Sequence, residues 1–202
     1  ELNRDIIMIP ENGEFQFQYG TYDFQDIRLS MAGRHQKENA SLAIAALIEL
    51  HERGKAVLDW NLMIRAMEET TWPGRIETLS EDPLVIIDGA HNNEAVEALV
   101  ETIGRQYPDR EITVLFSAIE GKPLSTMVEK LEGIADAFSV TDFDFPKALP
   151  KEDIYDKVKH PNRSMVDDHI QFIEAFEGDI LLVTGSLYFI SEIKQHYNAK
   201  RR

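Results

Sequence analysis

The sequence predicts an α/β protein with a mostly parallel sheet whose two faces are covered by helices. Two observations support this class. Strand-like and helix-like segments alternate from about residue 84 onward, and such alternation is typical of parallel sheets. Before that stretch, the pair Pro73 and Gly74 interrupts the pattern, and Pro with Gly often marks a boundary. We therefore expect two regions, residues 1–71 and residues 72–202.

The first region is predicted to contain a hairpin and two helices. Its strand-like segments are residues 5–9, 14–19 and 22–29. Aromatic and polar residues alternate in the middle segment, which predicts one buried face for Phe15, Phe17 and Tyr19. Apolar side chains recur at helical spacing over about residues 35–52 and 59–69. These elements are too few for a self-sufficient domain, so we expect the tail of a larger one.

The second region is predicted to alternate between the two kinds of element. Apolar or alternating stretches predict strands at residues 84–87, 111–116, 136–141 and 179–184. Apolar stripes at helical spacing, with capping residues, predict helices at residues 94–105, 123–131, 151–159, 168–176 and 187–197.

The composition limits the partners and the chemistry. Asp and Glu number 36 against 21 Lys and Arg, a formal charge of -15, and such a surface repels nucleic acids and anionic membranes. The chain has no cysteine, which excludes disulfides, thiolate metal sites and a cysteine nucleophile. The longest apolar run, residues 42–48, is too short to span a bilayer. We expect a cytoplasmic protein that binds neither nucleic acid nor membrane.

Two strand ends carry residues suited to a ligand. Asp88 and His91 lie in the run Asp-Gly-Ala-His-Asn directly after the strand at 84–87, and Ser186 closes a Thr-Gly-Ser turn before the last helix. Ligands of open α/β sheets bind at the carboxyl ends of strands, and helix N-termini favour anions. From these residues alone, turn and cap roles remain open for all three.

The usual motifs of a complete reaction are absent. The sequence holds no dinucleotide-binding Gly-x-Gly-x-x-Gly, and Gly121-Lys122-Pro123 is not a phosphate loop. It holds no His-Glu-x-x-His, and the stretch from Asp167 to His169 has no partner at metal-ligand spacing. No metal site is therefore predicted in this chain.

Four stretches, in order, resemble the folylpolyglutamate synthase and dihydrofolate synthase family, relatives of the Mur ligases. They are Gly-Arg-His-Gln-Lys-Glu-Asn-Ala at 33–40, Trp-Pro-Gly-Arg-Ile-Glu at 72–77, Asp-Gly-Ala-His-Asn at 88–92 and Thr-Gly-Ser-Leu-Tyr at 184–188. The resemblance covers nearly the whole chain. One departure is Asn93, where the family usually has proline; Asn can also cap a helix, so only a local effect is expected.

The resemblance implies a two-domain ligase of which this chain is the C-terminal portion. Residues 1–71 would be the remnant of the central ATP-binding domain, and residues 72–202 a Rossmann-like C-terminal domain. The chain does not begin with Met, which fits a fragment that would be inactive by itself. The missing N-terminal part would hold the phosphate loop, most Mg²⁺ ligands and much of the folate pocket.

The resemblance also implies the reaction and its cofactors. ATP, with Mg²⁺, would phosphorylate a folate carboxylate, and the amino group of L-glutamate would attack the acyl phosphate. Phosphoryl transfer needs mainly positioning and charge neutralisation. Arg75 would meet an ATP phosphate, and Gln36 and Asn39 would lie near the adenine. A purely structural pairing of Arg75 with Glu77 or another acid is the alternative.

The remaining roles fall on the two strand ends. Asp88 would contact the nucleotide or position the incoming amine, and His91 and Ser186 would hold the carboxylates of glutamate; Asp88 and His91 are the candidate catalytic residues. Synthesis of dihydrofolate by the same enzyme stays open. A stand-alone α/β module that binds a small anion or nucleotide is the alternative from another class, and another Mur-type amino acid ligase is the third.

Overall fold

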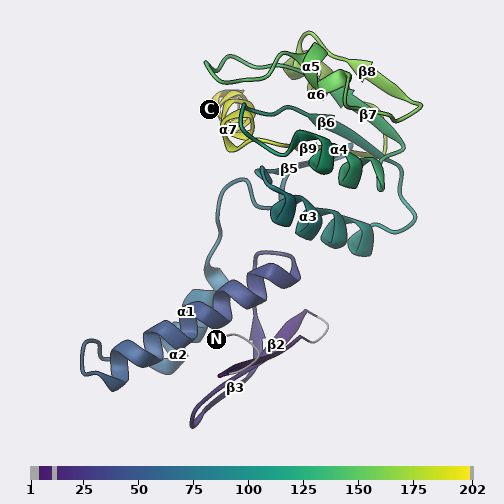
Figure 1. Ribbon diagram of the computed structural model, residues 1–202. Helices are drawn as coiled ribbons and strands as arrows, with labels where there is room; N and C mark the ends of the chain where they lie inside the picture. Colours follow the sequence, from purple (N-terminus) through teal and green to yellow (C-terminus); the bar gives the residue numbers. More distant parts are fainter. Residues whose placement is uncertain (1–4, 11–12, 201–202) are drawn as a thin grey trace. The chain divides into compact units, whose positions relative to one another are not determined.

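The computed structural model describes residues 5–10 and 13–200, and the chain divides into two compact units, Glu1–Trp72 and Pro73–Arg202 (Figure 1). Each unit has a sheet and a hydrophobic core of its own.

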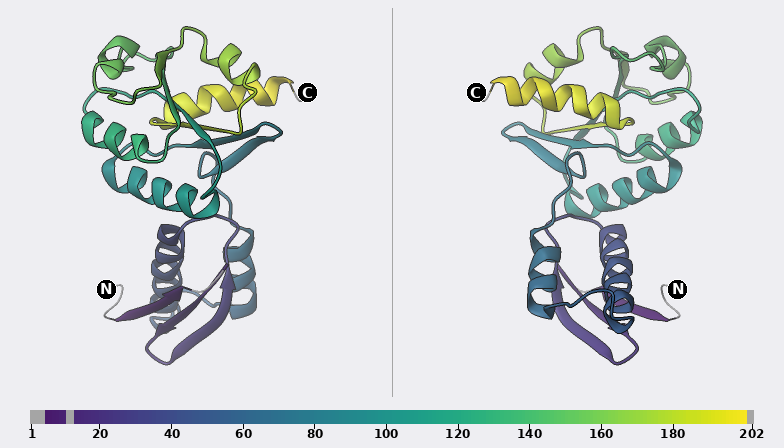
Figure 2. Two further views of the ribbon diagram at one scale, coloured as in Figure 1. Left: turned by 90° about the vertical axis from the view of Figure 1, so that its right-hand side faces the viewer. Right: turned by 90° about the vertical axis from the view of Figure 1, so that its left-hand side faces the viewer.

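The first unit is a three-stranded antiparallel sheet with two helices. The strands β1 (Ile6–Pro10), β2 (Glu14–Tyr19) and β3 (Tyr22–Arg28) pair in the order β1-β2-β3. The helices α1 (Arg34–Glu52) and α2 (Trp60–Glu69) pack against this sheet (Figure 2). The predicted alternation is confirmed for Phe15 and Phe17, which are fully buried, whereas Tyr19 is only half-buried and donates its hydroxyl to Glu49 at 2.6 Å.

The second unit is built on a six-stranded sheet of order β4-β5-β9-β6-β7-β8. Its strands are β4 (Glu77–Glu81), β5 (Leu84–Asp88), β6 (Ile112–Phe116), β7 (Ala137–Val140), β8 (Arg163–Met165) and β9 (Ile180–Thr184). Its helices are α3 (Asn93–Gln106), α4 (Leu124–Glu132), α5 (Lys151–Tyr155), α6 (His169–Glu174) and α7 (Leu187–Lys200). Only β4 runs antiparallel to its neighbour, so the sheet is mostly parallel and the predicted α/β class is confirmed.

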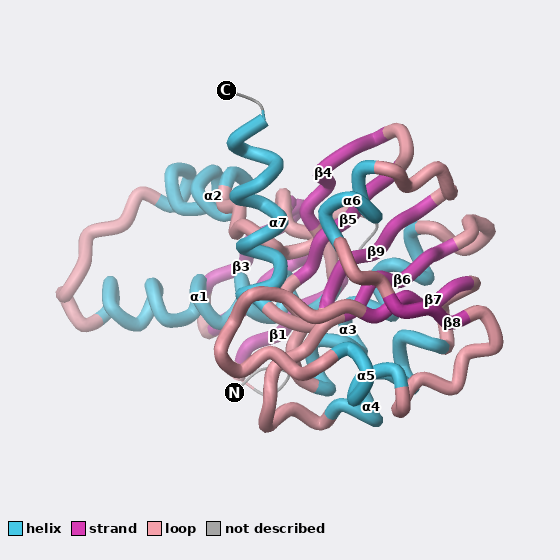
Figure 3. Tube along the Cα trace, turned by 90° about the horizontal axis from the view of Figure 1, so that it is seen from above, coloured by secondary structure: helices cyan, strands magenta, loops and turns pink. Residues whose placement is uncertain are grey.

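Helices cover both faces of this sheet, as Figure 3 shows from above. One core lies under α3, α4 and α5, and a second lies under α6 and α7. The central strands β5 and β9 are buried at every residue. A strand that is covered on both faces needs apolar side chains in both directions, which explains why these two segments have no alternating pattern.

The structure adds two edge strands that the sequence patterns did not predict. β4 contains Glu77, Ser80 and Glu81, and β8 is three residues long and exposed throughout. Edge strands have one free side and tolerate polar residues, so they carry little hydrophobic signal. The helix expected at residues 151–159 is also shorter than predicted, because α5 ends at Tyr155.

Candidate ligand site at the carboxyl edge of the sheet

Three central strands of the second unit end side by side. Asp88 pairs with Thr184 in the β5–β9 ladder, and Phe116 pairs with Thr184 in the β6–β9 ladder. The loops that follow these strands therefore meet at one edge of the sheet. This brings together the two predicted strand ends, together with the loop after β6 that leads to α4.

Asp88 joins two backbone segments at this edge. Its side chain is buried, and its two carboxylate oxygens accept hydrogen bonds from the N–H of Ile76 at 2.9 Å and of Ala90 at 2.8 Å. Burial raises the pKa of Asp88, while the two backbone donors and the nearby charges of Arg75 and His91 oppose that rise. Asp88 thus holds the loop after β5 against the segment that contains Arg75.

The raised pKa of Asp88 predicts that stability falls as pH rises. Between the usual value of 3.8 and the raised value, the folded chain keeps a proton that the unfolded chain has lost. The free energy of unfolding should therefore fall through this window, relative to an Asp88→Asn variant that does not titrate there. Urea unfolding of both proteins across pH measures the difference. A difference that is constant or grows with pH would contradict the prediction.

Arg75 is half-buried and keeps its guanidinium unpaired within the part of the chain that the structure describes. The alternative pairing with Glu77 is not formed, because Glu77 binds Lys194 and the backbone of Gly74 instead. A guanidinium without a partner retains all its donors for an anion.

His91 and Ser186 come from the two predicted loops. Nδ1 of His91 donates to the carbonyl of Gly89 at 2.8 Å, so in the neutral ring Nε2 is the nitrogen that can accept from a ligand. Ser186 is buried, and its Oγ accepts the N–H of Tyr188 at 3.2 Å, in the first turn of α7. The predicted cap role of Ser186 is therefore present alongside any ligand role.

One cavity of about 480 Å³ contains both side chains. It is lined by His91, Ile119, Lys122, Ser186, Leu187, Tyr188 and Ser191. Its volume is in the range of small-molecule sites. Neither Arg75 nor Asp88 lines it. Asp88 is instead bound to the N–H of Ile76, the residue next to Arg75.

Sequence patterns alone missed five of the seven lining residues, among them Lys122 and Tyr188. Lys122 lies in the loop after β6, whose sequence does not match a phosphate loop. Its position after a strand at the same edge is the signal that could identify it. The ring of Tyr188 stacks on Phe145, with centroids 4.2 Å apart. No pattern along the chain links Phe145 to Tyr188, because tertiary packing brings them together.

Gln36 and Asn39 belong to the first unit, in the first turns of α1. Gln36 is buried, and its amide nitrogen lies 3.0 Å from Nε2 of His35. Asn39 is exposed. Their expected place near adenine stays a prediction.

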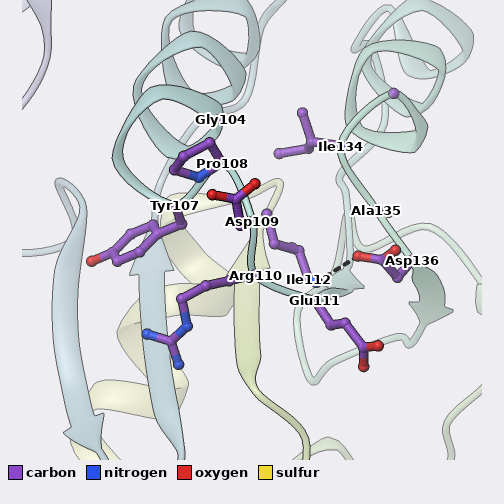
Figure 4. Close-up of a pocket in the computed structure, with 11 residues that line it drawn as sticks. Gly104, Tyr107, Pro108, Asp109, Arg110, Glu111, Ile112, Ile134, Ala135 and Asp136 are labelled. Atoms are coloured by element: carbon purple, nitrogen blue, oxygen red, sulfur yellow. Dashed lines mark hydrogen bonds between the residues drawn. The ribbon is translucent and has the colours of Figure 1, made fainter.

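A second cavity, of about 440 Å³, lies at the opposite edge of the same sheet, around the loops before β6 and β7 (Figure 4). Its arginine, Arg110, is paired with Asp179 through Nε at 2.9 Å, and Asp136 accepts the N–H of Ile112 at 2.8 Å. These charged groups already have partners. None of the predicted site residues lies there, so we assign no ligand to this cavity.

Two kinds of feature are missing from the described residues, 5–10 and 13–200. Within them, no cluster of three or more His, Asp or Glu side chains is placed to hold a metal ion. Within the same residues, none of the helices has the length and apolar character needed to cross a bilayer.

Comparison with known families places this site in a wider context. The family model described as "Mur ligase, glutamate ligase domain" matches residues 74–187. The chain belongs to the Mur ligase family. The matched stretch contains Arg75, Asp88, His91, Lys122 and Ser186, whereas the lining residues Tyr188 and Ser191 lie just beyond it.

The curated relatives of this Mur ligase chain include folate enzymes. It is 40% identical over 192 residues to a dihydrofolate synthase/folylpolyglutamate synthase of Bacillus subtilis, covering 93% of this chain and 45% of that protein. It is 28% identical to a folylpolyglutamate synthase of Lacticaseibacillus casei, covering 87% of this chain and 42% of that one. The chain thus spans less than half the length of these relatives.

Solved structures show the same fold. Escherichia coli FolC, in complex with DHPP and ADP, superposes with a TM-score of 0.86 at 18% identity, covering all of this chain and 48% of that one. A folylpolyglutamate synthase of Thermotoga maritima gives a TM-score of 0.81 at 23% identity, covering 98% and 47%. This Mur ligase chain therefore shares its whole described architecture with about half of each of these proteins.

Proposed function

We propose that this chain is the C-terminal part of an ATP-dependent ligase that joins L-glutamate to a folate. The observation that carries the proposal is the cavity at the carboxyl edge, in which His91, Lys122 and Ser186 meet from three loops. These groups suit a dicarboxylate amino acid, because the ammonium of Lys122 and the hydroxyl of Ser186 can donate hydrogen bonds to its carboxylates. Nε2 of His91 can accept a hydrogen bond from its amino group. The similarity to the Bacillus subtilis enzyme supports glutamate and folate as the substrates.

The neighbouring segment would receive the nucleotide. In this proposal Arg75 meets an ATP phosphate, since its guanidinium has no partner among the described residues. Asp88 positions the Arg75 segment through the N–H of Ile76 and contacts the nucleotide or the incoming amine. Gln36 and Asn39 would meet the adenine. We propose that most of the Mg²⁺ ligands lie in the N-terminal part of the ligase.

The chemistry follows from the weakness of a carboxylate as an electrophile. Transfer of the γ-phosphoryl group of ATP to a folate carboxylate oxygen gives an acyl phosphate and ADP. The neutral amino group of glutamate then attacks the acyl carbon and loses a proton as the amide forms. Inorganic phosphate leaves with the oxygen that came from the folate carboxylate. Held in the cavity, glutamate would be oriented for this attack. Water must be excluded until the attack is complete, because it would hydrolyse the acyl phosphate.

Release of ADP tests the proposal. The full-length ligase is incubated with ATP and Mg²⁺, and with a reduced folate, glutamate or both. We expect release that requires both substrates and is missing from the 202-residue chain. Release with a different acceptor would assign the chain to another Mur-type branch. Tight nucleotide binding by the 202-residue chain itself would favour a stand-alone binding module instead.

The Bacillus subtilis relative is also named as a dihydrofolate synthase, so dihydropteroate is the second acceptor to assay.

Replacing Lys122 by alanine should weaken glutamate binding selectively. Lys122 lines the cavity with His91 and Ser186, and loss of its charge removes a charge-assisted hydrogen bond. We expect KM for glutamate to rise by about tenfold or more, with KM for ATP unchanged. The matched control is Lys157→Ala, an exposed lysine after α5. Equal effects on both substrates would remove Lys122 from the glutamate site.

A further inference from the structure

An ion pair beside Arg75 is not used by any step of the proposed reaction. Glu77 is the first residue of β4, and Lys194 lies on α7. Nζ of Lys194 lies 2.7 Å from both carboxylate oxygens, and the N–H of Gly74 donates to Oε2 at 2.8 Å. The side chains of Lys194 and Glu77 are 26% and 29% exposed. Solvent therefore screens this pair less than an open surface pair.

The backbone on both sides of Arg75 is held by hydrogen bonds. Gly74 accepts the N–H of Gly89 at 2.8 Å, and Ile76 donates its N–H to Asp88 at 2.9 Å. Ile76 has φ +44°, which a β-branched residue seldom adopts. Such strain persists only where the surroundings over-determine the conformation. The segment is thus constrained on both sides of Arg75.

The same segment rests on α7. A Cβ added to Gly74 would lie 3.2 Å from Cγ2 of Ile190, one helical turn from Lys194. The N-terminal turn of α7 lines the cavity through Leu187 and Tyr188. One rigid helix therefore supports the wall of the cavity and the segment that carries Arg75.

Charge gives the pair a second effect. Glu77 is two residues from Arg75, and a carboxylate without its ammonium partner would attract the guanidinium. Bound to Lys194 and to the N–H of Gly74, the carboxylate of Glu77 is already satisfied. The guanidinium then does not have to leave a protein partner when an anion arrives.

We propose that Glu77 and Lys194 are positioning residues for Arg75. The pair fixes residues 73–77 against α7 and keeps the guanidinium unpaired for a phosphate of the nucleotide. This inference rests on the proposed function, in which Arg75 meets ATP. It adds two residues, one of them about 120 positions away along the chain, that act through Arg75 without touching the nucleotide.

Steady-state kinetics of the full-length ligase test the inference in two backgrounds. In the otherwise unchanged enzyme, Lys194→Gln and Glu77→Gln should each raise KM for ATP about tenfold and change kcat less than about twofold. Lys194→Arg should restore most of the loss, because it keeps the charge. In an Arg75→Ala background, Lys194→Gln should add less than about twofold, since the residue it positions is gone. The control is Lys130→Gln, which breaks the pair with Glu97 between α3 and α4.

The outcomes separate the two proposals. If Arg75→Ala leaves kcat/KM for ATP unchanged, the role that the proposed function gives to Arg75 is wrong. If Arg75→Ala impairs ATP use but neither Lys194→Gln nor Glu77→Gln does, the positioning role is wrong and the proposed function stands. The positioning role would also be wrong if Lys194→Gln raised KM for ATP by the same factor in both backgrounds. Lys194 would then act independently of Arg75. A thermal melt of each variant identifies any loss that comes from unfolding.

Discussion

Arg75→Ala should lower kcat/KM for ATP in the full-length ligase by about a hundred- to a thousandfold, the usual result of removing one preorganised charge donor from a reacting centre. The reason is geometric as well as electrostatic. Arg75 is half-buried near the charge of Asp88, its backbone neighbours are hydrogen-bonded, and its guanidinium forms no hydrogen bond or ion pair with a described residue. Release of ADP at varied ATP concentration, with folate and glutamate saturating, measures the loss.

Two companion variants sharpen this experiment. Arg75→Lys keeps the charge but not the planar pair of donors, so it should recover only part of the loss. Arg110→Ala is the control, because Arg110 is paired with Asp179 at the opposite edge of the sheet. If Arg75→Ala stays within about twofold of the unchanged enzyme, the assignment of Arg75 to the nucleotide must be abandoned.

Gly185→Ala should lower the free energy of unfolding by at least about 3 kcal/mol. Gly185 has φ +114°, and a Cβ there would collide with the carbonyl oxygen of Ser117 and lie 2.6 Å from Cε2 of Phe116. The oxygen is backbone, and the N–H of the same Ser117 donates to Thr184 at 3.2 Å. Neither neighbour can move without displacing β6 from β9, two central strands.

The matched control for this variant is Gly121→Ala. Gly121 also has a positive φ, +78°, but a Cβ there would meet nothing within 4 Å. The Gly121→Ala variant should therefore suffer only backbone strain, which lowers its free energy of unfolding by about 1 kcal/mol. Urea unfolding of the 202-residue chain measures both variants. Equal losses at the two positions would show that the close approach of Gly185 to Ser117 is not what requires glycine.

The close approach at Gly185 also places the candidate site. Gly185 lies between Thr184, the last residue of β9, and Ser186, which lines the cavity. A larger residue would push Ser186 away from the loop after β6, where Lys122 lies. We therefore interpret the glycine as the reason that two loops from different strands can line one cavity.

Most elements of this fold could be predicted from local patterns. The central strands are continuous apolar runs and the longer helices have apolar stripes. The order of apolar residues along the chain therefore predicts which side chains are buried. β4 and β8 could not be predicted in this way. They are polar edge strands, and their pairing depends on β5 and β7, to which nothing in their own residues points.

The candidate site divides in the same way. Asp88, His91 and Ser186 could be selected because each follows a strand or precedes a helix, where ligands of α/β sheets bind. Lys122 cannot be selected in this way, because its loop matches no motif. The ion pair between Glu77 and Lys194 also could not be predicted from the sequence, because it joins residues 117 positions apart.

The sequence alone thus predicts the α/β class, the strand ends that carry polar side chains and the family resemblance. Each of these depends only on residues that are close together along the chain. The tertiary structure decides which ends share a cavity, which carboxylate holds which cation and which glycine has no room for a methyl group. Strand order, β5-β9-β6, is what makes the difference. β9 comes last along the chain yet lies between β5 and β6, so Ser186 meets His91 and Lys122 only once the whole sheet is assembled.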